Sequence, residues 1–285
     1  MTMEDLKALL TSLARSAVRL DIGTGEGPEI GQFGGMPDLP EGFAWPHFVT
    51  DTYLDDEVKP RPLAFLCQFD CAALAALDGD GLLPREGVLS FFYELGSQRW
   101  GYAPQDAGCA RVYWFSEKGA LRLADFPETL EEEFRLPALP IRGRMERRFP
   151  GYDDAGVAAG KAEGELNRKA FEAAYSMTAG KQETDWPAHR LLGWPDIIQS
   201  NMTVECELVS RGYNLGGGQK IPKEQIREAE ETSLENWRLL LQLDTIQQGR
   251  FSLDFGDCGR VYFYIRTEDL AARRFDRVWL VLQCG

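Results

Sequence analysis

Phe65-Leu66-Cys67-Gln68-Phe69-Asp70 is a pattern that occurs twice in this chain, since Leu239-Leu240-Leu241-Gln242-Leu243-Asp244 repeats it. Two further pairs of stretches surround these in the same order. Gly35-Met36-Pro37-Asp38 corresponds to Gly193-Trp194-Pro195-Asp196, and residues 108–115 correspond to residues 257–264. Three stretches in one order predict a duplicated unit. We expect a single domain, residues 1–285, built of two degenerate repeats over about 21–140 and 185–285, with a helical insertion at about 150–180.

Short apolar runs rich in β-branched and aromatic residues predict most of the strands. A strict alternation of polar and apolar residues from Met202 to Leu208 predicts one more half-buried strand. The other expected strands cover residues 62–70, 88–94, 109–115, 251–255, 261–265 and 278–282. Strands of this kind, joined by turns, favour a mostly antiparallel sheet.

Helices are predicted in three places. An apolar stripe at helical spacing runs from Leu6 to Val18. Residues 158–177 have the same spacing, and a charged helix is expected to begin at Pro222 and run towards Leu241. Residues 21–46 are rich in glycine and proline and predict an ordered loop with short extended pieces. The fold class predicted is therefore α+β, with an N-terminal helix and inserted helices added to the sheet.

The formal net charge of −14 argues against a nucleic-acid partner, because binding to phosphate backbones needs a positive surface. It is compatible with a basic protein partner. Acidic side chains gather at residues 51–57 and 128–133, and a basic run follows at residues 142–148. Solvated surface is the simplest interpretation of all three. No apolar run is long enough to span a membrane and the N-terminus lacks a secretion signal pattern, so we expect a cytoplasmic protein without a membrane partner.

Cysteine and histidine give no sign of a metal site. The six cysteines lie in or beside apolar stretches, where free thiols act as small buried hydrophobes. The close pair Cys67 and Cys71 lacks zinc-ribbon spacing, and the only histidines are His47 and His189. We expect no metal and no cofactor.

No familiar catalytic pattern is present. The sequence has no Gly-x-Ser-x-Gly elbow, and two histidines offer few bases for a serine or cysteine nucleophile. Residues 216–220 lack the spacing of a phosphate-binding P-loop, and Asp78-Gly79-Asp80-Gly81 lacks the glutamate that would complete a calcium loop. Turns are the simpler interpretation of both.

The repeated polar residues are the first candidate site. Gln68 with Asp70, and Gln242 with Asp244, each point to one face of an expected strand. Arg111 and Arg260 each follow a cysteine by two residues. A buried pairing of arginine with carboxylate in each half would hold the strands in register. Alternatively, these six residues line a cleft between the halves and orient a ligand.

Aromatic residues beside residues 96–99 are the second candidate. Trp100 and Tyr102 fall outside the expected strand, and Arg99 precedes them. Aromatic and arginine side chains are favoured anchors of protein interfaces. We therefore take these three residues as candidates for contact with a partner.

The chain resembles the YwqG-like family, a bacterial family of uncharacterised function. The resemblance rests on residues 34–40 through Trp45 and Pro46, on residues 191–196, and above all on the ending from Asp257 to Phe263 and from Phe275 to Cys284. It implies an α+β fold and a link to bacterial toxin and immunity systems. It supplies no reaction and no catalytic residues.

Two functions remain open from the sequence. The first is a non-enzymatic binding module that recognises a protein partner through its acidic surface and Trp100. The second is a small-molecule binder or hydrolase with a site between the repeats, where Asp70 and Asp244 share acid and base roles and Arg111 and Arg260 assist.

Overall fold

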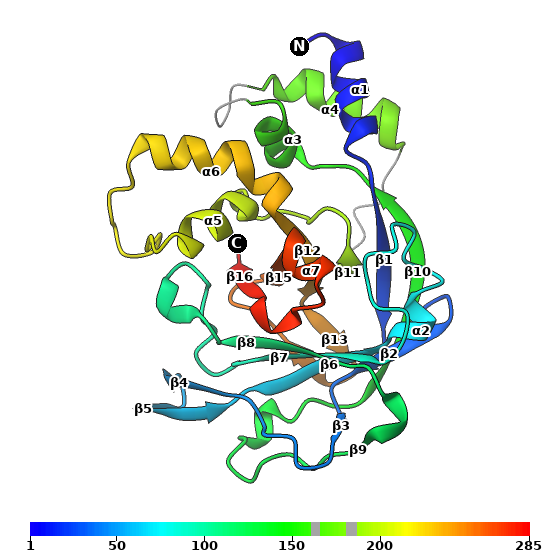
Figure 1. Cartoon of the computed structure of the whole chain (residues 1–285), viewed down its shortest axis with the longest axis vertical. Helices are drawn as coiled ribbons and strands as arrows, with labels where there is room; N and C mark the ends of the chain where they lie inside the picture. The colour runs from blue at the N-terminus through cyan, green and yellow to red at the C-terminus, as the bar shows by residue number, and fades with distance from the viewer. Residues whose placement is uncertain (161–165, 181–186) are drawn as a thin grey trace.

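The structure is a computed structural model that describes residues 1–160, 166–180 and 187–285. Helices and a mostly antiparallel sheet confirm the α+β class (Figure 1). The α-helices of the described residues are α1 (Met3–Ser12), α2 (Cys71–Leu74), α3 (Tyr152–Ala158), α4 (Arg168–Ala179), α5 (Met202–Ser210), α6 (Lys223–Asn236) and α7 (Thr267–Ala271). None of these helices is both long and apolar enough to cross a membrane.

Ten strands form one sheet, in the order β16-β15-β12-β11-β1-β10-β2-β6-β7-β8. Their bounds are β1 (Arg15–Ile22), β2 (Glu29–Phe33), β6 (Ala64–Asp70), β7 (Val88–Tyr93), β8 (Ala110–Phe115), β10 (Leu139–Arg148), β11 (His189–Leu192), β12 (Trp237–Asp244), β15 (Arg260–Arg266) and β16 (Trp279–Gln283). Three two-stranded sheets stand apart: β3 (Asp38–Pro40) with β9 (Leu121–Leu123), β4 (His47–Thr52) with β5 (Asp55–Pro62), and β13 (Ile246–Gln248) with β14 (Phe251–Leu253).

The large sheet curls until its two ends face each other. Phe91 of β7 packs edge-on against Phe263 of β15, with ring centroids 5.2 Å apart. One apolar core inside the curl takes side chains from strands of both ends. The loop after β7 helps to close the gap, because Leu282 of β16 donates its N–H to the carbonyl oxygen of Trp100 at 3.0 Å.

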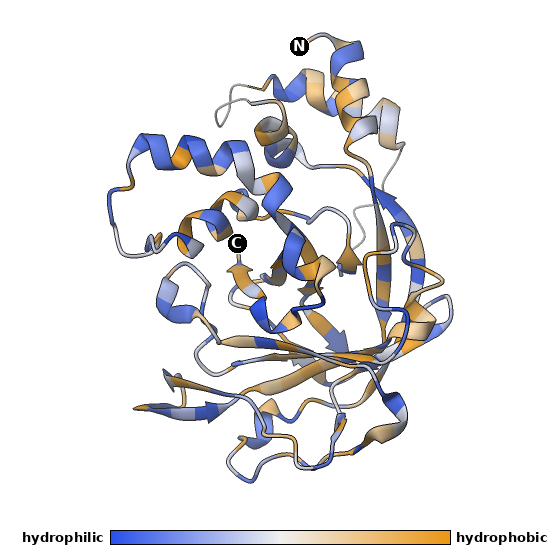
Figure 2. Ribbon diagram, viewed as in Figure 1, coloured by the Kyte–Doolittle hydropathy of each residue, from blue (hydrophilic) through white to orange (hydrophobic). Residues whose placement is uncertain are grey.

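The longer helices lie on the outside of the curled sheet (Figure 1). Met202 and Cys206 of α5 pack on Trp237, Tyr262 and other residues of the outer face. Helix α6 packs on α5 and turns a largely hydrophilic surface outward (Figure 2). Helix α1 packs on α4, where Leu10 and Phe171 belong to one buried cluster.

Most of the predicted strands and the N-terminal helix are confirmed, but the helix ends earlier than expected. Helix α1 stops at Ser12, and Ala17 and Val18 belong to strand β1. Both are buried in the sheet, so their apolar character reflects a strand and not a helical stripe.

The predicted strand at Met202–Leu208 is wrong, because these residues form helix α5. The Asn201 side chain caps this helix by accepting the N–H of Val204 at 3.1 Å. Helix α5 is buried on several sides, including at Thr203 and Glu207, so its sequence lacks the amphipathic pattern that would have revealed a helix.

One other expectation needs correction, and the basic run has a defined place in the sheet. Residues 142–148 form part of strand β10, between β1 and β2, and Arg144 and Arg147 are exposed there, in keeping with a solvated surface. The single helix expected at 158–177 is replaced by α3 and α4, and residues 161–165 of that prediction lie outside the described residues.

The first two repeated stretches make the same contacts in both halves. The N–H of Asp38 donates to Gln68 Oε1 at 3.0 Å, and Gln68 Nε2 donates back to Asp38 Oδ2 at 3.3 Å. The N–H of Asp196 donates to Gln242 Oε1 at 2.9 Å, and Gln242 Nε2 donates back to Asp196 Oδ2 at 3.1 Å. These matching contacts support the duplication, which stays a prediction.

The third repeated stretch does not fall in equivalent strands. Strand β8, with Arg111, pairs with β7 at one end of the sheet. Strand β15, with Arg260, pairs directly with β12. Strand β6 is the counterpart of β12, and β6 pairs with β7. The counterpart of β15 is therefore β7 and not β8, so the expected equivalence of Arg111 and Arg260 is wrong.

Candidate functional site

The predicted residues of the second half form a buried polar network. Asp244 is 1% exposed, and its Oδ2 accepts hydrogen bonds from Arg260 Nε at 2.8 Å and from the N–H of Ala188 at 3.0 Å. Gln242 lies beside it and contacts Asp196, as described above. Asp196 also accepts from Arg148 at 2.5 Å and from Arg190. The expected buried pairing of arginine with carboxylate is present in this half.

Charges around this network decide its protonation. Burial acts to raise the pKa of Asp196, but the guanidiniums of Arg190 and Arg148 hold it below its ordinary value. Burial lowers the pKa of His189 to about 3, so its ring is neutral and accepts the N–H of Asp244 at Nδ1. A network with these fixed charges holds β11, β12 and β15 together.

The first half has a different pairing. Asp70 Oδ2 binds Lys118 Nζ at 2.6 Å, and both side chains are partly exposed. Asp70 also caps helix α2 by accepting the N–H of Ala72 at 2.9 Å. Arg111 lies two strands away from Asp70, and no described ion pair joins them. The expected Asp70–Arg111 pairing is absent from the described contacts.

The structure does not bring the two halves of the predicted site together. Every pairing from β6 through β2, β10, β1 and β11 to β12 is antiparallel, so β6 and β12 run in opposite directions. Asp70 and Asp244 are the last residues of these strands, and the two strands end on opposite rims of the sheet, so the two carboxylates lie on opposite rims. A cavity of about 330 Å³ beside Gln68 and Asp70 has none of Gln242, Asp244 and Arg260 in its wall. A shared acid-base pair of Asp70 and Asp244 does not fit this geometry.

The predicted partner residues lie at the closure of the sheet. Arg99 donates to Thr50 Oγ1 at 2.6 Å and to Asp51 Oδ1 at 2.7 Å, which ties it to strand β4. Trp100 is 41% exposed. Tyr102 packs on the outer apolar cluster, and its hydroxyl donates to Gln199 Oε1 at 3.0 Å. Of the three, Trp100 has the side chain most open to solvent, while Arg99 and Tyr102 make structural contacts.

An arginine pair, Arg15 and Arg238, forms a site that the sequence did not indicate. Strands β1 and β12 flank β11 and are both antiparallel to it, so they begin at the same edge of the sheet. Leu191 of β11 pairs with Val18 on one side and Leu241 on the other. Arg15 and Arg238 each lie three residues before these partners. The register therefore places both residues at one rim of the sheet.

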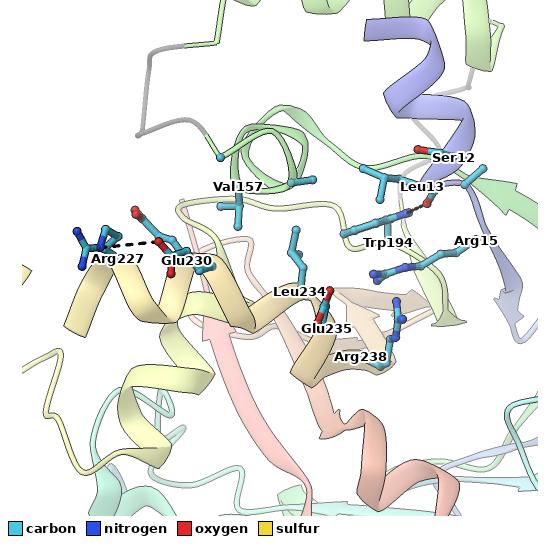
Figure 3. Close-up of a pocket in the computed structure, with 14 residues that line it drawn as sticks. Ser12, Leu13, Arg15, Val157, Trp194, Arg227, Glu230, Leu234, Glu235 and Arg238 are labelled. Carbon is cyan, nitrogen blue, oxygen red and sulfur yellow. Dashed lines mark hydrogen bonds and ion pairs between the residues drawn. The ribbon is translucent and has the colours of Figure 1, made fainter. Parts of the chain in front are cut away.

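Two cavities meet at this pair. One of about 720 Å³ lies between the segment before β1, helix α3, Trp194 and helix α6. The other, about 430 Å³, lies at the mouth of the curled sheet beside Asp80 and α7. Arg15 and Arg238 line both cavities. Figure 3 shows the two side chains directed towards the same part of the larger cavity.

Trp194 fixes the position of Arg15. The guanidinium carbon of Arg15 lies 3.5 Å from the centroid of the Trp194 ring, a cation-π contact. The ring is 1% exposed and donates its N–H to the carbonyl oxygen of Leu13 at 2.7 Å. Arg15 therefore presents its guanidinium edge, where its hydrogen-bond donors lie, towards the cavity.

The two arginines lack ion-pair partners within the described parts of the chain. No carboxylate lies within 4 Å of either guanidinium among these residues. Burial, together with the charge of Arg238, lowers the pKa of Arg15 to about 9. Burial likewise lowers the pKa of Arg238, against the charges of Asp80 and Glu235. A guanidinium group keeps its proton at neutral pH, so both side chains carry a positive charge that no described ion pair compensates.

Two buried polar groups lie close enough to Arg15 to affect its charge without pairing with it. Asp154 of α3 is 1% exposed and accepts from Asn201 Nδ2 through Oδ1 at 2.7 Å. Its Oδ2 and the hydroxyl of Tyr264 have no hydrogen-bond partner among the described residues. Burial raises the pKa of Asp154 to about 7, although the charge of Arg15 opposes this shift.

The fold and the rim define an α+β protein with one curled antiparallel sheet and a cationic cavity at its edge. Residues 31–284 match the family model described as Domain of unknown function (DUF1963), and the chain belongs to this family. The match is consistent with membership of a family of uncharacterised function, and the resemblance to the YwqG-like family itself stays a prediction. Arg238 lies inside the matched region and Arg15 precedes it. No curated protein matches the chain.

Proposed function

We propose that the protein binds a small molecule through an anionic group, a carboxylate or a phosphate, held between Arg15 and Arg238. The observation that carries this proposal is the pair of guanidiniums facing one cavity without a described carboxylate in contact. Both arginines are partly buried, and an anion would supply the partner that their partly desolvated charges lack. Guanidinium groups bind both kinds of anion with paired hydrogen bonds.

The shape of the site supports a binding role. Its volume of about 720 Å³ lies in the range typical of small-molecule sites, about 300–1,000 Å³. Trp194 holds Arg15 in place before any ligand arrives, which reduces the entropy lost on binding. This is the small-molecule alternative from the sequence, moved to a different place in the fold.

Thermal unfolding of the purified protein with acetate, malonate, sulfate and inorganic phosphate tests the proposal. A ligand that binds only the folded state raises the unfolding temperature. We expect a saturable rise with at least one anion and its loss in Arg15→Gln and Arg238→Gln. Arg250→Gln is the matched control, because Arg250 is exposed on the turn between β13 and β14. An equal rise in all four proteins would contradict the proposal.

We propose partner binding at the β4–β5 hairpin as a second candidate function. The hairpin exposes apolar side chains to solvent, with Val49 at 60%, Tyr53 at 67% and Val58 at 65%. Its tip also contacts the second acidic stretch, since the Tyr53 hydroxyl donates to Glu133 and its ring packs edge-on against Phe134. Exposed apolar residues rimmed by charges are typical of interaction sites.

The charges of this hairpin favour a partner with basic and apolar side chains. Asp56, Glu131 and Glu132 are exposed near the apolar residues, whereas Asp55 is paired with Lys59 at 2.7 Å. Pull-down with wild type and Val58→Asp tests this candidate, with Met177→Glu as a control at another exposed apolar position. A partner kept by the control and lost by Val58→Asp is expected. Identical captures by all three proteins would count against it.

A further inference from the structure

The wall that helix α6 forms is mostly acidic, and it begins beside Arg238, since Glu235 lies close enough to affect the pKa of that arginine. Helix α6 contributes Glu230, Glu231 and Glu235 to the lining of the larger cavity. Glu231 is paired with Arg227, with Nε and Oε1 3.8 Å apart. Glu230 and Glu235 make no ion pair with any described residue. Figure 3 shows both on α6, facing the cavity that Arg15 and Arg238 enter from the sheet.

Apolar side chains lie between the arginine pair and Glu230. Leu13, Val157 and Leu234 line the same cavity between the rim and the outer part of α6. Their side chains offer no hydrogen bonds to a ligand, so this middle part of the cavity contributes apolar contacts. The cavity therefore has a positive end at the sheet and a negative side along the helix.

We propose that the natural ligand is dipolar, an amino acid or a short peptide, with its carboxylate between Arg15 and Arg238 and its ammonium group facing Glu230 or Glu235. This inference rests on the proposed anion binding and adds the class of ligand. A carboxylate satisfies the guanidiniums, and an ammonium group would give Glu230 or Glu235 the ion-pair partner that neither has among the described residues.

The same charges disfavour ligands with several anionic groups. A second phosphate or carboxylate would lie against Glu230 or Glu235, where like charges repel. A ligand whose remaining part is uncharged would leave both glutamates without an ion-pair partner. The acidic wall thus selects among the anions that the arginines accept.

Isothermal titration with acetate, glycine, triglycine and N-acetyl-triglycine tests this inference. We expect glycine or triglycine to bind more tightly than acetate, and N-acetyl-triglycine to lose about fivefold relative to triglycine, the scale of one partly exposed ion pair. The double variant Glu230→Gln/Glu235→Gln should lose the same factor for the zwitterion, while its affinity for acetate should not fall. Glu231→Gln is the matched control on the same helix, since its partner is Arg227.

The outcomes separate the two proposals. If acetate and phosphate bind with dependence on Arg238 but acetylation and the glutamate variants change nothing, the dipolar ligand is overturned and anion binding stands. If none of these probes binds wild type, the proposed function fails first. Tighter binding of a polyanion such as citrate than of triglycine would also overturn the dipolar ligand.

Discussion

Asp244 and Asp70 end corresponding repeated stretches, yet their surroundings differ in a way that predicts different stability effects. Asp244 is buried and paired with Arg260, while Asp70 is partly exposed and paired with Lys118. Removing one partner of a buried ion pair leaves an uncompensated charge, whereas exposed pairs contribute little. The repeated aspartates are therefore a matched pair for testing the structural role of the second network.

We predict that Asp244→Asn lowers the free energy of unfolding by about 3 kcal/mol and Asp70→Asn by less than about 1 kcal/mol. Asparagine keeps the cap on helix α2 in the second variant, so the loss there is confined to the exposed pair. Urea unfolding measures both. Equal losses would show that burial of Asp244 does not decide its contribution.

Asp154 predicts a dependence of stability on pH. Its pKa is raised by burial from 3.8 to about 7, so the folded state keeps a proton that the unfolded chain releases. The stability that this group contributes is fully present below the unfolded pKa of 3.8 and is lost as the pH rises to the folded pKa of about 7. Asp154→Asn removes the titration and keeps the acceptor for Asn201.

The unfolding free energy of wild type minus that of Asp154→Asn should therefore fall by up to about 4 kcal/mol as the pH rises from 4 to 7. Measuring the difference removes the effects of the other shifted groups. Burial raises the pKa of Glu205 to about 7, with the same sign, and His189 has the opposite sign. A difference that stays constant with pH would mean that Asp154 is ionised in the folded protein throughout.

Elements differ in how far the sequence predicts them, and local signals explain the difference. Strands β7, β15 and β16 are continuous apolar runs bounded by turns, and each is found where it was expected. Strand β10 carries a basic run in which Arg148 pairs with Asp196, while Arg144 and Arg147 are exposed. Such a strand has no apolar pattern of its own. Its place depends on pairing with β1, which local sequence does not encode.

The candidate site could not be predicted for a similar reason. Arg15 and Arg238 are far apart in the chain, and each lies at the start of a largely apolar strand, a common place for a solvated arginine. Only the pairing of β1 and β12 on either side of β11 brings them to one rim. The repeated glutamines were recognisable because each contacts an aspartate from its own repeat, and this local pairing left a pattern in the sequence.

Gly101, in the loop that closes the sheet, should not tolerate a larger side chain. Gly101 has a φ of +77°, and a Cβ there would lie 1.7 Å from the carbonyl oxygen of Leu280 in β16. Gly42 has a φ of +73°, and a Cβ added there would have nothing within 4 Å. Gly42→Ala should therefore show the backbone effect alone, about 1 kcal/mol.

Gly101→Ala should destabilise the protein by clearly more than Gly42→Ala, because the loop must move away from β16 as well. Chemical denaturation of the two variants measures this, and the fluorescence of Trp100 and Trp279 should change only in the first. Equal effects would mean that the closing contact contributes no stability.

At the scale of the whole molecule, one sheet and one core join both predicted repeats. Strands β1 and β10 lie almost entirely outside the predicted repeats and connect β2 of the first to β11 of the second, and the core takes residues from each repeat. A structure connected in this way should unfold as one unit. We expect coincident urea transitions by tryptophan fluorescence and far-ultraviolet circular dichroism. Two separated transitions would show that the repeats are independent domains.

The rim exists only because the whole sheet sets the register, and the central claim is that its two arginines bind an anion. Isothermal titration of inorganic phosphate into wild type and Arg238→Gln at low ionic strength tests this claim most directly, since salt screens the interaction. The account predicts saturable binding at one site in wild type and at least about tenfold weaker binding in the variant. Equal affinity in the two proteins would contradict it.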